Sequence, residues 1–341
     1  MLTAAFIGFG NSVVNYHLPY LAHSQHVNVK RIFRREEDRI GDTERELDYP
    51  ELQFTTHLND VLHDPDIQLI VVCTYVDSHV EYARLALEHG KHVLVEKPFA
   101  ATPQEAQQIF DLAKQRGLIA MANQNRRFDG DFLTLKQVLD SGKLGQLVEL
   151  QSHYHYFMPD RIQPGFMMLH GLAVHTIDQL YSLFGQPEHI HYDVRSARFP
   201  GESDDYIDID FHYGHFKATV KCSLTARLDY PKFIVHGDRG SFIKYSSGHQ
   251  SQSSKQPGRT VVQLEQEPEH NWGKLAWIDE QGRPQEQLVP SEITDYSLLY
   301  EQLYRAIVHG EAKPVQDEEV LSVLRILEQG VEAAKQHVPA R

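Results

Sequence analysis

The hydrophobic pattern of the chain changes character near residue 122. Before it, short apolar runs alternate with segments whose apolar residues recur at helical spacing. The runs at 69–73 and 92–95 are almost wholly apolar, which is typical of parallel strands buried on both faces. Apolar residues three to four apart predict a helix at 79–90, and 102–117 has the threonine, proline, glutamate and final glycine of a capped helix. This alternation indicates a parallel sheet with right-handed crossovers.

The second part of the chain has strand-like alternation and a few long helices. Hairpin patterns at 206–224 and 232–246 indicate an antiparallel sheet with two different faces. The polar stretch at 246–259 is predicted to be a loop. The other expected elements are a helix at 131–145, a long strand at 146–158, a helix at 166–185, and closing helices near 296–310 and 317–336.

Size and charge narrow the classes of function. The 341 residues exceed what one compact core usually holds, so two domains are expected. A net charge of −14 without a basic run argues against nucleic acid as a partner. No apolar stretch approaches the roughly 20 residues that span a bilayer, and the N-terminus resembles a strand rather than a signal peptide. Cys73 and Cys222 lie in apolar runs, as expected for reduced thiols of a cytoplasmic protein, and the 21 histidines lack metal-ligand spacing, so no metal site is expected.

The first strand runs into a glycine turn, Gly8-Phe9-Gly10-Asn11-Ser12, which is followed by a helical pattern. In dinucleotide-binding folds the first two glycines allow a tight turn and the close approach of backbone N–H groups to a pyrophosphate. Val13 replaces the third glycine, and Pro19 is expected to limit or bend the helix. The turn predicts a dinucleotide site, with a tight turn that binds no ligand as the alternative.

The second strand ends in Arg34 and Arg35, which are followed by Glu36, Glu37 and Asp38. An NAD site usually places a carboxylate at this strand end, where it binds the ribose 2′-hydroxyl. Guanidinium groups suit the 2′-phosphate of NADP instead, so the sequence predicts NADP(H) in preference to NAD(H). In the alternative, both arginines pair with the carboxylates that follow them.

The apolar run that ends at Val95 leads directly into Glu96-Lys97-Pro98. By itself, this tripeptide is an ordinary charged strand end. At the carboxyl edge of a parallel sheet, where ligands bind, it places a lysine beside the cofactor. Pro98 then stops the strand and fixes the direction of the lysine.

Four stretches resemble the glucose–fructose oxidoreductase, inositol dehydrogenase and rhizopine-catabolism (Gfo/Idh/MocA) family. They are AFIGFG, VVCTYVDSHVEYARLALEHGKHVLVEKPFA, NQNRRF and GLAVHTIDQLYSLFG, and beyond about residue 185 the resemblance is one of layout only. The resemblance implies an α/β protein with a Rossmann domain at 1–122, built on a doubly wound parallel sheet. It also implies an α+β domain at 123–341 with a large, mostly antiparallel sheet, which serves substrate binding and oligomerisation.

The family resemblance also implies where the cofactor and the catalytic groups lie. It assigns to the cofactor Gly8, Phe9, Gly10, Asn11, Ser12, Arg34, Arg35, Thr74, His79, Glu96, Lys97 and Asn125. It assigns the catalytic centre to Lys97 and His175. Hydride transfer at a carbinol carbon needs a group that handles the hydroxyl proton, which suits His175, and one that stabilises negative charge on oxygen, which suits Lys97.

The helix that carries His175 departs from the family pattern. Dehydrogenases of the family usually have an aspartate four residues before the histidine, where this chain has Gly171. In a regular α-helix His170 lies roughly 140° around the axis from His175, so it is no simple substitute. Asp178 shares the side of His175 and either orients the imidazole or joins a hydrogen-bond network. This departure from the family pattern bears on the identity of the substrate more than on the class of reaction.

Further substrate contacts are expected from two segments. On the strand at 146–158, alternation places Tyr154 on one face with Ser152 and Tyr156, and the sequence does not say which face meets the substrate. Arg127 is a candidate contact for cofactor or substrate, with a structural ion pair as the alternative.

These residues together predict an NAD(P)-dependent oxidoreductase that transfers a hydride between nicotinamide and a carbinol or carbonyl carbon of a sugar, polyol or related small molecule. The alternative is a non-catalytic, nucleotide-binding regulator on the same scaffold. A third hypothesis is transient redox at a sugar carbon that assists bond cleavage. Because one face of an antiparallel sheet needs a cover, a homodimer or a larger symmetric oligomer is expected.

Overall fold

The computed structural model describes residues 1–245, 252–255 and 258–336. The chain forms two compact units, each with a large sheet of its own. Unit 1 comprises Met1–Phe128, Ser251–Leu264 and Asp295–Leu324, and unit 2 comprises Asp129–Gln250, Glu265–Thr294 and Arg325–Arg341.

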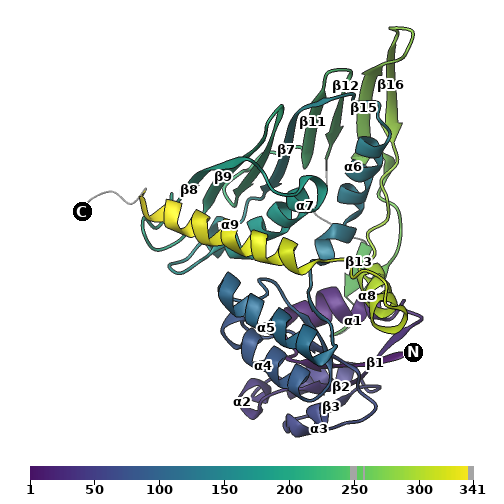
Figure 1. The fold of residues 1–341 in the computed structure, drawn as a ribbon, viewed down its shortest axis with the longest axis vertical. Helices are drawn as coiled ribbons and strands as arrows, with labels where there is room; N and C mark the ends of the chain where they lie inside the picture. Colours follow the sequence, from purple (N-terminus) through teal and green to yellow (C-terminus); the bar gives the residue numbers. More distant parts are fainter. Residues whose placement is uncertain (246–251, 256–257, 337–341) are drawn as a thin grey trace. The chain divides into compact units, whose positions relative to one another are not determined.

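Unit 1 contains a six-stranded parallel sheet with the order β3-β2-β1-β4-β5-β6 (Figure 1). The order reverses direction at β1, so the crossovers pass on both faces and the sheet is doubly wound, as predicted. The strands are β1 (Leu2–Ile7), β2 (Val27–Phe33), β3 (Gln53–Thr55), β4 (Leu69–Val72), β5 (His92–Val95) and β6 (Ala120–Ala122). The helices are α1 (Leu18–Leu21), α2 (Glu36–Arg39), α3 (Asn59–Leu62), α4 (Val76–Glu88), α5 (Pro103–Arg116) and α8 (Ser297–His309).

Two helix ends in unit 1 show how local sequence signals are realised. The capping box before α5 is confirmed, because the Thr102 side chain accepts from the Glu105 backbone N–H and the Glu105 carboxylate accepts from that of Thr102. Pro19 does not end the first helix. A π-helical turn at Val13–His17 precedes α1, and Pro19 lies in the first turn of α1. Proline has no backbone N–H to donate, and this wider turn tolerates the missing hydrogen bond.

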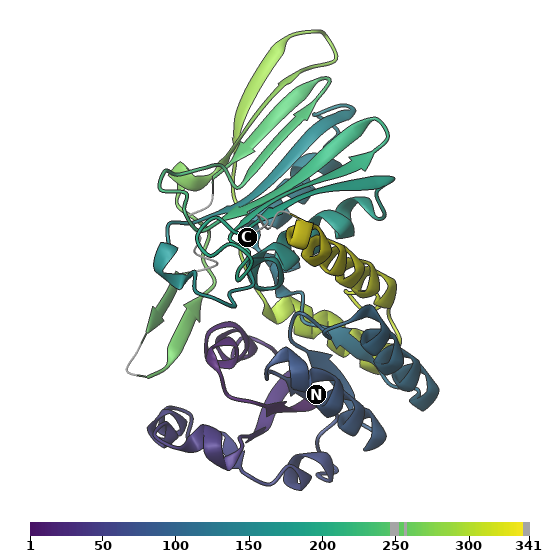
Figure 2. The ribbon, with the colours of Figure 1, turned by 90° about the vertical axis from the view of Figure 1, so that its left-hand side faces the viewer.

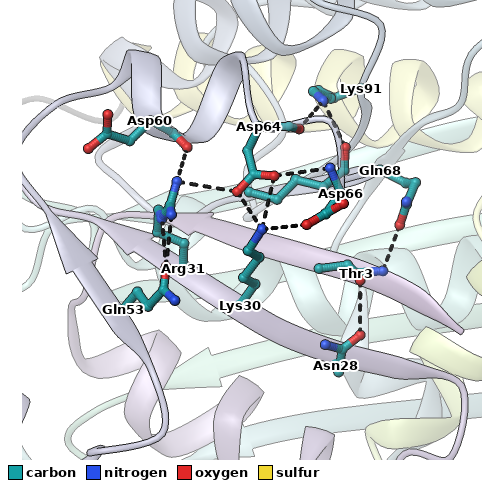
Figure 3. Close-up of polar contacts among 11 residues, drawn as sticks. Thr3, Asn28, Lys30, Arg31, Gln53, Asp60, Asp64, Asp66, Gln68 and Lys91 are labelled. Carbon is teal, nitrogen blue, oxygen red and sulfur yellow. Dashed lines mark hydrogen bonds and ion pairs between the residues drawn. The ribbon is translucent and has the colours of Figure 1, made fainter.

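A polar network lies near the amino ends of β1, β4 and β5 (Figure 3). The Lys30 ammonium lies 2.7 Å from the Asp64 carboxylate and 2.8 Å from Asp66, and the Lys91 ammonium donates to two backbone carbonyls of the same connection. Hydrogen bonding to Asp64 raises the pKa of Lys30. These contacts tie strand β2 to the loop before β4, at the sheet edge opposite the glycine turn, so we assign them a structural role.

Unit 2 contains an eight-stranded sheet with the order β16-β15-β12-β11-β7-β10-β9-β8, with α6 and α7 on one face (Figures 1 and 2). All neighbours are antiparallel except β7 and β10, which confirms a mostly antiparallel sheet. The strands are β7 (Leu147–His155), β8 (His189–Arg195), β9 (Tyr206–Tyr213), β10 (Phe216–Ser223), β11 (Phe233–Gly237), β12 (Gly240–Lys244), β15 (Gly273–Ile278) and β16 (Pro284–Val289). The helices are α6 (Gly130–Asp140) and α7 (Val174–Phe184), and α9 (Asp317–Gln336) continues into this unit from unit 1.

The loop predicted at 246–259 is wrong in part. Residues Gln252–Lys255 form strand β13, which pairs antiparallel with β14 (Thr260–Gln263). Cross-strand backbone pairing overrides the polar composition there. Residues 258–259 belong to no helix or strand, as predicted, and the rest of the prediction, at 246–251 and 256–257, lies outside the described residues. In the described part of the chain, no helix is both long and apolar enough to cross a membrane.

Candidate functional site

The carboxyl ends of the parallel strands of unit 1 carry most of the residues predicted to bind the cofactor. Gly8 follows β1, Arg34 follows β2, Cys73 and Thr74 follow β4, and Glu96 follows β5. In doubly wound sheets this edge is the one that binds ligands. The parallel pairing therefore gathers segments that are far apart in the sequence.

The two glycines of the turn have different reasons to be glycine. Gly8 has φ +100°, and a Cβ there would lie 2.4 Å from the carbonyl oxygen of Cys73, so the protein's own backbone demands glycine. At Gly10 a Cβ would meet no atom within 4 Å. Because the fold leaves the space beside Gly10 open, this turn fits the close approach of a pyrophosphate to backbone N–H groups.

A cavity of about 670 Å³ opens at this turn. Of the predicted cofactor residues it is lined by Gly8, Phe9, Gly10, Asn11, Ser12, Arg34, Arg35 and Thr74. Residues that the sequence analysis did not select also line it, among them Asp38, Asp42, Arg45, Tyr75, Asp77, Ser78 and Tyr82. His79, Glu96, Lys97 and Asn125 are not among its lining residues. The cavity thus joins the glycine turn to the end of β2 and the start of α4, as an adenosine-binding half site requires.

The two predicted arginines differ in how far they are engaged. The Arg34 side chain is 3% exposed and forms ion pairs of 2.8 Å with Asp42 and with Glu46. Arg35 is half exposed and pairs with Asp38 at 2.8 Å and with Glu37 at 3.3 Å. Carboxylates therefore bind both guanidinium groups, as the alternative predicted. The carboxylates that pair with Arg34 lie further along the chain than residues 36–38, which that alternative proposed.

Arg45 is a cavity residue that the sequence analysis missed. Its guanidinium donates a 2.9 Å hydrogen bond to the side-chain oxygen of Asn11. Its ion pair with the Asp42 carboxylate is long, at 3.7 Å. It also lies 5.5 Å from the centre of the Phe9 ring. No sequence signal singles it out, because it lies twelve residues beyond the end of β2, in the 3₁₀ turn Thr43–Asp48, and reaches the glycine turn only through the fold.

Glu96 is held at the end of β5 by three donors. Its Oε1 lies 2.7 Å from His17 Nε2 and accepts a 2.9 Å bond from the Asn123 amide, and its Oε2 accepts the backbone N–H of Lys97 at 3.0 Å. Burial alone would raise the pKa of Glu96, but the His17 hydrogen bond, the charges of His17 and Lys97, and the Asn123 bond outweigh burial and lower it to about 2. Glu96 is therefore a largely buried anion, 12% exposed, with its own partners.

Lys97 lies beside this anion, and the peptide bond to Pro98 is cis. Burial lowers the pKa of Lys97, the negative charge of Glu96 opposes the effect, and the positive charge of Arg126 adds to it. A desolvated ammonium next to a fixed carboxylate is suited to stabilising negative charge that develops on a nearby oxygen.

His79 and Asn125 are buried around this strand end. The ring nitrogens of His79 lie 2.9 Å from the Pro98 carbonyl oxygen and 3.1 Å from that of Thr74. His79 therefore links the segment after β4 to the segment after β5. Asn125 is 8% exposed in the 3₁₀ turn Asn125–Phe128 that follows β6.

Arg127 takes part in a structural ion pair. Its guanidinium lies 2.9 Å from the Glu319 carboxylate and donates to the Pro314 carbonyl at 3.0 Å, and the side chain is 9% exposed. This is one of the two roles that its sequence context allowed. A role toward substrate stays a prediction.

In unit 2 His175 and Asp178 lie buried on α7, and a π-helical turn at Leu169–Ala173 precedes that helix. The Asp204 carboxylate accepts the backbone N–H groups of Met168 and Leu169 at the start of this turn. Burial raises the pKa of Asp204 to about 7, against the lowering effect of these backbone bonds. Asp204 thus anchors the start of the segment that carries His175, a contact that the sequence did not signal.

The π turn changes the helical geometry assumed from the sequence. The Val174 backbone N–H bonds to Leu169, five residues back, so each residue of the turn advances by less than the 100° of an α-helix. His170 therefore lies closer to the side of His175 than a regular helix implies, and the angle of roughly 140° is wrong. A Cβ at Gly171 would meet no atom within 4 Å, so the space that a family carboxylate would occupy is open.

The structure decides which face of β7 packs against α7. The Ser152 and Thr176 hydroxyl groups are hydrogen-bonded, so Ser152 and the residues that alternate with it, including Tyr154, face that helix. The buried ammonium of Lys232 lies 3.0 Å from the centre of the Tyr154 ring. Lys232 is a second residue that the sequence analysis missed, because this cross-strand neighbour is defined only by the sheet.

Comparison with known proteins gives matches over nearly the whole chain. Residues 2–124 match the Gfo/Idh/MocA model described as "Oxidoreductase family, NAD-binding Rossmann fold". Residues 136–341 match the companion model described as "Oxidoreductase family, C-terminal alpha/beta domain".

Individual proteins agree with these models. The chain is 44% identical to the uncharacterized oxidoreductase YhhX of Escherichia coli (strain K12), over 98% of this chain and 97% of that protein. It is 28% identical to the scyllo-inositol 2-dehydrogenase (NADP(+)) IolW of Bacillus subtilis (strain 168), over 98% of this chain and 94% of that protein. A crystal structure of an oxidoreductase named yhhX has a TM-score of 0.88 at 43% identity and covers 98% of this chain and 97% of its own.

Proposed function

The chain belongs to the Gfo/Idh/MocA oxidoreductase family, and on that premise we propose that it is an NAD(P)-dependent dehydrogenase or reductase of a sugar, polyol or related small molecule. The observation that carries the proposal is Lys97, a partly desolvated ammonium beside a largely buried carboxylate at the sheet edge that also bears the glycine turn. The substrate class is supported by similarity to IolW, an enzyme named for the oxidation of an inositol.

In the proposed reaction a bound nicotinamide supplies the hydride chemistry. The Lys97 ammonium binds the substrate oxygen and stabilises the negative charge that develops there. His175 takes the hydroxyl proton during oxidation and returns it during reduction. Asp178 orients the imidazole, and Tyr154 and Arg127 are proposed substrate contacts.

We propose NADP(H) as the preferred cofactor, with Arg35 and Arg45 as the guanidinium groups that meet the 2′-phosphate. Arg35 is half exposed and lines the cavity, and Arg45 lines it with a weaker carboxylate contact than Arg34 has. Arg34 then serves mainly to fix the segment that carries Asp42 and Glu46, since four of its contacts lie there. We assign His79, Glu96 and Asn125 a supporting role, because they do not line the cavity and instead hold the ends of the strands beside it.

The proposal divides the chain into a dinucleotide-binding domain at 1–122 and a substrate and oligomerisation domain at 123–341. A homodimer or a larger symmetric oligomer is part of it, because α6 and α7 cover one face of the eight-stranded sheet and the other face needs a partner. The mass of the protein in solution tests this part, and a monomer would refute it.

A non-catalytic, nucleotide-binding regulator is the second candidate. The observation that favours it is Gly171, which removes the carboxylate that family dehydrogenases usually place before the histidine. Turnover separates the two candidates, because a regulator binds the cofactor without consuming it.

The test is a panel of sugars, polyols and their keto forms, assayed with NADP⁺ and with NADPH by the absorbance of the reduced nicotinamide. We expect turnover of at least one compound, and Lys97→Ala is expected to abolish it while cofactor affinity changes by less than about tenfold. Turnover near that of the wild type in Lys97→Ala would remove Lys97 from the mechanism. Cofactor binding without turnover on the whole panel would favour the regulator.

A further inference from the structure

A chain of buried and partly buried hydrogen bonds links α8 to the lysine at the end of β5. His17 is 1% exposed, and its Nδ1 lies 2.5 Å from the Tyr300 hydroxyl while its Nε2 lies 2.7 Å from Glu96 Oε1. The other oxygen of Glu96 accepts the backbone N–H of Lys97. The order along the chain of bonds is therefore Tyr300, His17, Glu96, Lys97.

The chemistry of the partners sets the direction of each bond. An ionised carboxylate only accepts, so the proton between His17 and Glu96 belongs to Nε2. A neutral imidazole that is protonated at Nε2 presents a lone pair at Nδ1, to which the Tyr300 hydroxyl can donate. Tyr300 thereby holds a neutral His17 in the one tautomer that donates to Glu96, and a protonated His17 donates to Glu96 through the same Nε2.

We propose that His17 and Tyr300 are positioning residues for Lys97, because they hold Glu96 ionised and in place, and Glu96 fixes the backbone and the charge environment of the lysine. The inference rests on the proposed role of Lys97. Neither His17 nor Tyr300 is among the residues that the family resemblance assigned to the site.

Several titratable groups surround Glu96. In the described part of the chain, those that act on Glu96 or Lys97 include His17, Cys73, Tyr300 and Arg126, and the neutral Asn123 amide adds one bond to Glu96. Burial raises the pKa of the Cys73 thiol well above its usual value, so this group is neutral and adds no competing charge. Burial likewise raises the pKa of Tyr300, which keeps its hydroxyl protonated as a donor.

The same residues also resemble a metal site in part. Ligand atoms of His17, Cys73 and Glu96 all lie within 4.8 Å of one another, the one such group among the described residues. A metal at His17 Nε2 would have to replace the 2.7 Å hydrogen bond to Glu96 and would need a thiolate at Cys73. The raised pKa of the thiol disfavours the thiolate, so we argue for the hydrogen-bonded form.

The test measures the titration of the Lys97 ammonium without using turnover. Wild-type protein and variants are acylated with acetic anhydride over a series of pH values, and peptide mass spectrometry reports the labelling of Lys97, with the exposed Lys136 as internal reference. Glu96→Gln is expected to move the Lys97 curve to lower pH by about one unit, because the ammonium loses its anionic neighbour. His17→Phe is expected to move the curve in the same direction, and His17→Gln, which keeps an N–H donor, by less.

Phe6→Leu is the packing control, since the Phe6 ring contacts the His17 ring edge to face at 5.4 Å and carries no polar group. It is expected to lower the melting temperature and leave the Lys97 curve unchanged. A folded His17→Phe protein with the wild-type curve would overturn the inference, as would one equivalent of a transition metal in the wild type that is lost in His17→Phe. Turnover by Lys97→Ala, by contrast, refutes the proposed role of Lys97 and leaves the titration result standing.

Discussion

The Arg45 guanidinium reaches the glycine turn and donates a 2.9 Å hydrogen bond to the Asn11 side chain. Its contact with a carboxylate is longer than any made by Arg34 or Arg35. A phosphate that binds Arg45 therefore disrupts weaker ion pairs than one that binds Arg34 or Arg35. A charge-assisted hydrogen bond of this kind contributes about 1.5–3 kcal/mol.

Arg45→Gln should therefore weaken NADPH binding by about tenfold or more and change NADH binding by less than about threefold. Fluorescence titration of both cofactors at one ionic strength measures this. Arg39→Gln is the matched control, because Arg39 lies in the same part of the chain and pairs with Glu46 at 2.8 Å but does not line the cavity. Equal binding of NADH and NADPH by the wild type would refute the proposed preference for NADP(H). An unchanged preference in Arg45→Gln would refute only the proposed role of Arg45.

The two turn glycines should fail in different ways when replaced by alanine. Gly8→Ala places a methyl group against the Cys73 carbonyl at φ +100°, so we expect a loss of stability on the order of 2 kcal/mol or more. Gly10→Ala meets no atom of the protein, so its melting temperature should stay near that of the wild type while cofactor affinity falls. Thermal unfolding and cofactor titration of both variants separate the effects. Wild-type cofactor affinity in Gly10→Ala would show that no pyrophosphate approaches there.

Glu96 predicts a pH dependence of stability with a definite sign. Its folded-state pKa of about 2 lies below the usual 4.5, so the stabilisation is complete above pH 4.5 and is lost as the pH falls from 4.5 toward 2. The shift corresponds to on the order of 3 kcal/mol. The difference in unfolding free energy between wild type and Glu96→Gln should therefore shrink as the pH falls. Denaturant unfolding at several acidic pH values measures it, and a constant difference would contradict the buried anion.

Gly171→Asp should restore the family carboxylate without a cost in stability. A side chain at this position meets open space, and glycine within a helical segment is itself unfavourable by roughly 0.5–1 kcal/mol. A carboxylate near His175 stabilises the protonated imidazole, so the pH of half-maximal turnover should rise by about one unit. Gly171→Asn, which lacks the charge, is the control. A melting temperature lowered by Gly171→Asp would show that the space is not available.

Local sequence signals determined the elements that depend on neighbouring residues. The capping box at Thr102 and Glu105 is read directly from the sequence, because its partners are three residues apart. The turn at Gly8 and Gly10 was predicted from its two glycines, because glycine adopts the backbone of a tight turn readily. The parallel sheet followed from the alternation of strands and helices, since a parallel pair needs a crossover between its strands.

Tertiary structure decided the partners of each charged group. Arg34 and Arg35 were recognised at the end of β2, but only the fold showed which carboxylates engage them and brought Arg45 to Asn11 across 34 residues. His17 meets Glu96 across 79 residues and Tyr300 across 283, and the π turn before His175 depends on the capping carboxylate of Asp204. Hydrogen bonds and ion pairs of this kind are fixed by distance in space, which the order of residues along the chain does not encode. The sequence by itself therefore determined where the proposed catalytic lysine lies, and the tertiary structure decided what holds it there.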